Sequence, residues 1–156
     1  MHRLALLALA ACGRIDFDPL APTPDAALRL VETINILATG EVQTSNTILA
    51  AGVTYQLVAR GVCDISGVPN LEDAEWNFDA AETVMNDLGD TGLADTGLGI
   101  NDTVVDGDKL PKWGPYRHDH IYTIVFAGLG APITADLHDS APGNNTGSLT
   151  LEIYGP

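Results

Sequence analysis

Residues 28–37 read LRLVETINIL, and in this stretch Ile34 and Ile36 alternate with Thr33 and Asn35. Successive side chains of an extended strand point to opposite faces, so this alternation predicts a β-strand with one buried face. β-branched residues, which favour strands, are common here and in the rest of the chain.

Similar stretches recur on the C-terminal side, separated by Gly, Pro and Asn. They cover residues 46–51, 53–60, 73–78, 97–105, 120–127, 133–138 and 148–154. Short strands at this spacing predict an all-β protein, an antiparallel β-sandwich. A short helix capped by Asp79, with Glu82 in a capping box and Gly89 at its end, is also expected. A longer helix beginning near Ala74 is the alternative, since apolar residues recur there at helical spacing.

The chain has 156 residues and a net charge of −14, with no Lys or Arg between Gly61 and Asp108. This length suits one domain. An acidic surface repels phosphate backbones and anionic lipid, so nucleic-acid binding is not expected. We expect residues 66–110 to form an acidic insertion on the surface. Its acids serve either solubility or cation binding.

The N-terminus has the features of an export signal. Arg3 precedes an apolar run over residues 4–11, which is too short to span a membrane, and Cys12 follows. Residues 9–12 (LAAC) resemble the bacterial lipobox, whose cysteine carries the lipid; a chance cysteine is the alternative. The chain then divides into a signal peptide (1–11), a lipid-anchored linker (12–27) and a β-sandwich domain (28–156). By resemblance to such lipoproteins, Gly13 after the cysteine implies an outer-membrane lipoprotein of the cell envelope, which would touch the membrane through its lipid anchor alone.

Cys63 is the one cysteine left once Cys12 is lipidated, so no intrachain disulfide is expected. It is either a reactive thiol or a small buried hydrophobic residue, and the second is the more common role.

A loop near the C-terminus is rich in oxygen ligands. Asp139 ends one predicted strand, and Asn144 and Asn145 precede the next. A carboxylate and two amide carbonyls suit Ca²⁺, which prefers oxygen ligands. An ordinary Asn/Gly turn is the alternative.

Four segments together resemble the PA-IL-like family of galactophilic, calcium-dependent bacterial lectins. They are residues 40–42 (GEV), 52–61 (GVTYQLVARG), 112–115 (KWGP) and 143–148 (GNNTGS). The resemblance implies a galactose-binding, jelly-roll-like β-sandwich that holds Ca²⁺. The loop from Asp139 to Asn144 is two residues shorter than the family's, and the acidic insertion departs from its pattern.

The resemblance also implies site residues. Asp139, Asn144 and Asn145 would be side-chain ligands of the calcium ion, and the backbone carbonyl of Ile65 would join them. A carbohydrate of the galactose type would bind the same ion, with His118 or His120 contacting the sugar.

Trp113 and Tyr116 would form a stacking wall for a sugar ring; for Trp113, a place in the core is an equal alternative.

No set of residues indicates an enzyme. Asp90-Thr91-Gly92 and Asp95-Thr96-Gly97 resemble the aspartic-protease motif, but both lie in one loop, whereas the protease carboxylates meet across a two-fold axis. The segment 118–120 (HDH) offers two imidazoles, whereas zinc needs a further protein ligand, for which His138 is the nearest candidate. We therefore expect no enzyme but a lipid-anchored, calcium-dependent carbohydrate-binding module. A calcium-stabilised structural or adhesion domain is the alternative.

Overall fold

The computed structural model describes residues 27–65, 71–87, 97–101, 113–139 and 142–156, and in these ranges it is all-β with antiparallel sheets. This confirms the predicted fold class. The elements are β1 (Arg29–Leu37), β2 (Gln43–Thr44), β3 (Thr54–Arg60), β4 (Cys63–Asp64), β5 (Leu71–Glu72), β6 (Trp76–Phe78), β7 (Val84–Asp87), β8 (Gly97–Ile100), β9 (Ile121–Ala127), β10 (Thr134–His138), the short 3₁₀ helix η1 (Pro142–Asn144) and β11 (Thr146–Gly155).

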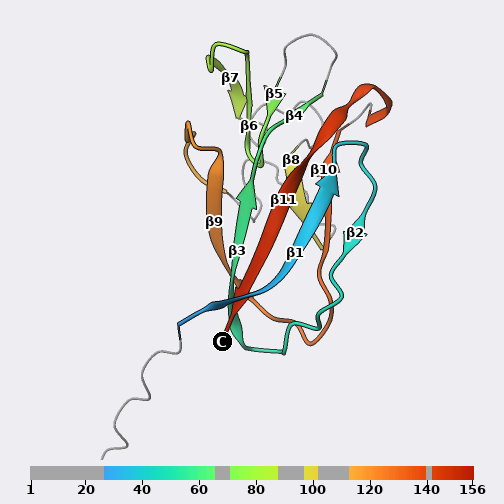
Figure 1. The fold of residues 1–156 in the computed structure, drawn as a ribbon, viewed down its shortest axis with the longest axis vertical. Coiled ribbons are helices and arrows are strands. Elements are labelled where there is room, and N and C mark those ends of the chain that lie inside the picture. Colours follow the sequence, from blue (N-terminus) through green and yellow to red (C-terminus); the bar gives the residue numbers. More distant parts are fainter. Residues whose placement is uncertain (1–26, 66–70, 88–96, 102–112, 140–141) are drawn as a thin grey trace, which may run out of the picture.

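β11 organises the larger sheet because it pairs with three other strands. It runs antiparallel to β1 along most of its length, to β3 over Thr150–Tyr154, and to β4 at Thr146 and Gly147. β9 extends the sheet beyond β3, while β5, β6 and β7 follow β4 in order. Figure 1 shows β4 to β7 gathered at the end of the molecule opposite the C-terminus.

A second sheet has the order β2-β10-β8, and both sheets supply one hydrophobic core. From the larger sheet, the core takes Ile36, Leu57 and Leu151; from the smaller, Leu98 and Leu137. Two antiparallel sheets that share a core are consistent with a β-sandwich. In β11 this burial alternates residue by residue, as expected for a strand with one face inward.

The expected helix after Asp79 is wrong, because residues 79–83 close a β-hairpin between β6 and β7. The Asp79 carboxylate does accept backbone N–H bonds, from Ala81 and Thr83, as a helix cap would. However, Glu82 has a positive φ of 59°, which a right-handed helix does not tolerate. The Asp79 N–H then bonds back to the Thr83 carbonyl, at 3.1 Å, and Val84 continues as a strand.

The expectation that the acidic segment is solvated surface is wrong for residues 72–78 and 97–100, which are largely buried, whereas residues 80–85 are exposed. Glu72, Asp73 and Glu75 are buried, as are Phe78 and Leu98. This stretch therefore brings three carboxylates into the interior.

The lipobox and linker, residues 1–26, lie outside the described residues. Within the described ranges, the structure has no helix of the length and apolar character that a membrane crossing requires.

Candidate functional site

The loop between β10 and β11 is held by the side chain of Asn145. This side chain is 6% exposed. Its Nδ2 donates to the backbone carbonyl of Ala38 at 2.9 Å and to Oδ2 of Asp139 at 3.0 Å. The expectation that Asp139 and Asn145 share one tight loop is therefore confirmed. The amide oxygen Oδ1 of Asn145 is buried and has no hydrogen-bond partner among the described residues.

Glu72, in β5, is a second buried group with unused oxygens. Its exposed fraction is 0%, and neither carboxylate oxygen has a hydrogen-bond partner in the described structure. Burial raises the pKa of Glu72 well above its usual value, and the negative charges of Asp139 and Asp73 raise it further. An ionised carboxylate buried without a partner is costly, so this position calls for either a proton or a cation.

Strand register relates Glu72 to the start of β11, next to which Asn145 lies. Cys63, in β4, pairs with Glu72 on one side and with Gly147 of β11 on the other. Directly paired residues point to the same face of a sheet, so the Glu72 side chain lies on the buried face with Cys63. Asn145 is two residues from Gly147, and the negative charge of Asp139 raises the pKa of Glu72. We refer to Glu72, Asp139 and Asn145 as the oxygen cluster.

The other two expected ligands lie beside this cluster. Asp64 pairs with Thr146, so the next residues along these strands are Ile65 and Asn145. Ile65 is half-buried and packs against the core, and Asn144 is exposed at the end of η1. A role for either as a calcium ligand stays a prediction.

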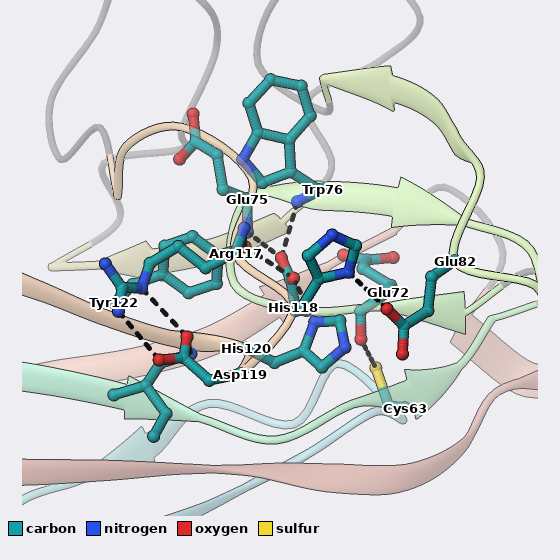
Figure 2. A network of polar contacts seen from close by, with 12 residues as sticks. Cys63, Glu72, Glu75, Trp76, Glu82, Arg117, His118, Asp119, His120 and Tyr122 are labelled. Carbon is teal, nitrogen blue, oxygen red and sulfur yellow. Dashed lines mark hydrogen bonds and ion pairs between the residues drawn. The ribbon is translucent and has the colours of Figure 1, made fainter.

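Asp73, the neighbour of Glu72, has its carboxylate fully occupied. Oδ1 accepts the backbone N–H groups of Glu75 and Trp76, at 2.9 and 2.8 Å. Oδ2 accepts the hydroxyl of Tyr122 at 2.8 Å and lies 2.9 Å from Nδ1 of His120. Figure 2 shows this network around β5 and β6. Asp73 therefore fixes the chain that carries Glu72 and has no oxygen left for a ligand.

The segment 113–120, which we call the histidine loop, packs against the β6–β7 hairpin. The His120 ring stacks on Phe78, with centroids 4.7 Å apart, and its backbone has a positive φ of 47°. His118 reaches Glu82 through Nδ1 (Figure 2) and has a side chain 77% exposed. Tyr116 packs edge-on against both histidines, and its hydroxyl is buried without a partner among the described residues.

Trp113 belongs to the core rather than to a sugar-binding surface, which corrects its place among the expected ligand contacts. Its ring is 4% exposed, and its Nε1 donates to the Leu98 carbonyl at 3.1 Å. Its backbone N–H donates to the buried carboxylate of Glu75 at 2.8 Å. Of the expected sugar contacts, His118 is the most accessible, and Tyr116 and His120 are partly buried.

Each of the three described histidines pairs with a different carboxylate. His118 pairs with Glu82, His120 with Asp73, and His138 with Asp136 at 3.2 Å. In the described ranges, no three His, Cys, Asp or Glu side chains form a group that could hold a metal ion. A cation at the oxygen cluster would therefore need amide and backbone oxygens in addition to carboxylates, which is the ligand mixture that calcium accepts.

The sequence singles out Asp139 and Asn145 as candidate ligands but not Glu72. The available signal was the pair Glu72-Asp73 next to a short strand, but charged residues are rarely buried and the segment reads as surface.

Comparison with known proteins gives no further guide. No protein-family model matches the chain, no curated protein matches it, and no solved structure matches it. What the site can do has to be inferred from its own residues.

Proposed function

We propose that this protein is a calcium-dependent carbohydrate-binding module, and that the oxygen cluster is its cation site. The observation that carries the proposal is the buried amide oxygen of Asn145, which has no partner while the same side chain donates to Asp139. A buried acceptor without a partner is costly, and a cation bound there would offset the cost. The resemblance of residues 143–148 to the calcium-binding turn of PA-IL-like lectins supports the same ligand.

Carbohydrate binding is supported by what lies next to this site. Asp73, the residue after Glu72, holds His120 through a 2.9 Å contact and so fixes the histidine loop. In this loop His118 offers an exposed imidazole and Tyr116 an aromatic edge. Sugar hydroxyls bind both calcium and such groups, because they are compact oxygen donors and acceptors.

The test is a glycan array probed with the purified protein in calcium and again in EDTA. We expect calcium-dependent retention on a subset of glycans, galactose-type sugars among them, and its loss in Asn145→Ala. Calcium binding without retention on any glycan would contradict the carbohydrate proposal and favour the structural or adhesion domain instead.

We further propose that the domain is held on the outer membrane through a lipid on Cys12. The pairing of β1 with β11 indicates which end of the domain an anchor would join. Arg29, at the start of β1, pairs with Gly155 near the C-terminus, and Leu37, at its end, pairs with Ser148. The strand thus enters at the end where the C-terminus lies, and β4 to β7 lie at the opposite end (Figure 1). An anchor preceding β1 would therefore join the domain at the end opposite β5, the strand that carries Glu72.

Fractionation of a Gram-negative host tests the anchor. Wild-type protein should be found with the membranes, and Cys12→Ala should be found in the soluble fraction. Equal amounts of both in the soluble fraction would contradict the lipid anchor.

A further inference from the structure

The buried Glu72 carboxylate has no counterpart in the calcium-binding turn expected from the sequence. It comes from β5, far along the chain from Asp139 and Asn145, and reaches the same interior through the pairing of Cys63 with both Glu72 and Gly147. Both of its oxygens lack partners in the described structure, and its exposed fraction is 0%.

We infer that Glu72 is a third side-chain ligand of the cation, contributed by β5 to the oxygen cluster. The inference rests on the proposed function, since it assigns a further residue to that same cation site. Three of the buried atoms without a partner in the described structure belong to the oxygen cluster: both carboxylate oxygens of Glu72 and Oδ1 of Asn145. Several donors already have other acceptors: Nδ2 of Asn145 bonds to Ala38 and Asp139, and the His120 and Tyr122 side chains bond to Asp73.

Charge decides which ligand fits these acceptors. The unpartnered oxygens of Glu72 and Asn145 are acceptors, and the carboxylate of Asp139 lies against Asn145. A divalent cation offers positive charge to all of them at once, whereas a proton on Glu72 would occupy only one carboxylate oxygen. Calcium suits the set better than magnesium, because it accepts a bidentate carboxylate and takes about six to eight oxygens in a flexible shell.

Binding by Glu72 has a structural consequence. Glu72 belongs to the small strands β4 to β7, which also carry the hairpin that contacts His118, whereas Asp139 and Asn145 belong to the loop between β10 and β11. A cation shared by all three residues would tie these two parts together and hold the histidine loop, through Asp73, in a fixed position.

The test is calcium titration calorimetry on the purified protein and four variants, one of which, Asp139→Asn, removes the charge of the loop carboxylate. Glu72→Gln keeps the size of the side chain and removes its charge, and Glu72→Asp keeps the charge on a shorter side chain. Glu82→Gln is the matched control, since it removes one negative charge from the neighbouring hairpin at a more exposed position. We expect Glu72→Gln to weaken calcium binding on the order of 100-fold, Glu72→Asp to be intermediate, and Glu82→Gln to stay within about twofold of wild type.

Melting in EDTA provides a second readout. Without calcium, Glu72→Gln should melt no lower than wild type, because a neutral side chain avoids the cost of a buried charge. With calcium, wild type should melt at a higher temperature than Glu72→Gln. Wild-type affinity in Glu72→Gln, together with lost binding in Asp139→Asn, would overturn Glu72 as a ligand and leave the proposed function intact. A wild-type protein that binds no calcium would overturn both.

Discussion

The amide nitrogen of Asn145 donates to the carboxylate of Asp139 across 3.0 Å, and the amide oxygen, Oδ1, is buried without a hydrogen-bond partner among the described residues. A second bond from the same nitrogen, to the carbonyl of Ala38, fixes the orientation of the amide against β1. The loop is therefore built to hold an oxygen at a defined position, which a simple Asn/Gly turn does not require.

Asn145→Ala should destabilise the protein even without calcium. The change removes both bonds from Nδ2, so we expect unfolding in EDTA to become easier by about 1–3 kcal/mol. Urea denaturation measures this directly. The matched control is Asn144→Ala, because Asn144 is the same residue type one position earlier and is exposed. Equal costs for the two variants would contradict the role assigned to the Asn145 amide.

Asp73→Asn should be among the most destabilising single changes in the described structure. The carboxylate accepts bonds from two backbone N–H groups, from Tyr122 and from His120, and an amide cannot accept all of them. We expect a loss of about 3–5 kcal/mol in thermal or urea unfolding. Asp119→Asn, which breaks an exposed pair with Arg117, should cost less than about 1 kcal/mol. Similar costs for both changes would contradict the buried network.

The Glu32 carboxylate should contribute to stability in a pH-dependent way. Burial raises its pKa, but hydrogen bonds from Asn46 and Thr47 outweigh that effect, and the pKa lies below the usual 4.5. The N–H groups of Asn46 and Thr47 lie 2.8 and 2.9 Å from the carboxylate oxygens. A lowered pKa stabilises the folded state above pH 4.5, and this contribution is lost as the pH falls through the folded-state value.

Glu32→Gln should therefore cost about 1 kcal/mol at pH 7, a modest figure because the group is only partly buried. The difference from wild type should shrink toward zero near pH 3. Urea denaturation at several pH values checks this, with the exposed Glu41→Gln as the control. A cost for Glu32→Gln that is constant from pH 3 to pH 7 would contradict the hydrogen-bonded carboxylate.

Cys63 should resist thiol reagents while the protein is folded. Burial raises the pKa of this thiol far above its usual value, and the charges of Glu72 and Asp73 raise it further. Its Sγ lies 3.5 Å from the Glu72 carbonyl (Figure 2). Since the thiolate is the reactive form, labelling of Cys63, located by peptide mass, should be slow in buffer and fast in denaturant. Rapid labelling in buffer would show that β4 and β5 open readily.

The sequence predicted the long strands well, because alternation is a local signal. β1, β3, β9, β10 and β11 fall within or close to the expected stretches. The short strands β2, β4, β5 and β7 were missed, since strands of two to four residues carry too little periodicity to detect. The expected strand over 46–51 was wrong, because this stretch forms an isolated bridge at Leu49 instead. The prediction of a helix after Asp79 failed for a physical reason: an aspartate that caps a turn makes the same backbone bonds as one that caps a helix.

In the candidate site, too, sequence patterns link residues that lie close together along the chain and do not link distant ones. Asp139 and Asn145 are six residues apart, so their spacing alone predicted a shared loop. Besides local backbone bonds, Asp73 and Glu75 have partners that lie 38 to 49 residues away along the chain, in Trp113, His120 and Tyr122. No local pattern links such residues, and only the folded arrangement shows that these acids are buried.

Thermal melting in calcium, in magnesium and in EDTA tests the central claim most directly. A ligand that binds only the folded state adds RT ln(1 + [L]/Kd), so calcium at about 100 times Kd should contribute about 2.7 kcal/mol. For a chain of this size, that raises the melting temperature by several degrees. Magnesium should raise it less, because it requires a tighter octahedral shell. We predict this order for wild type and no calcium shift for Asp139→Ala, whereas three superimposable wild-type curves would contradict the cation site.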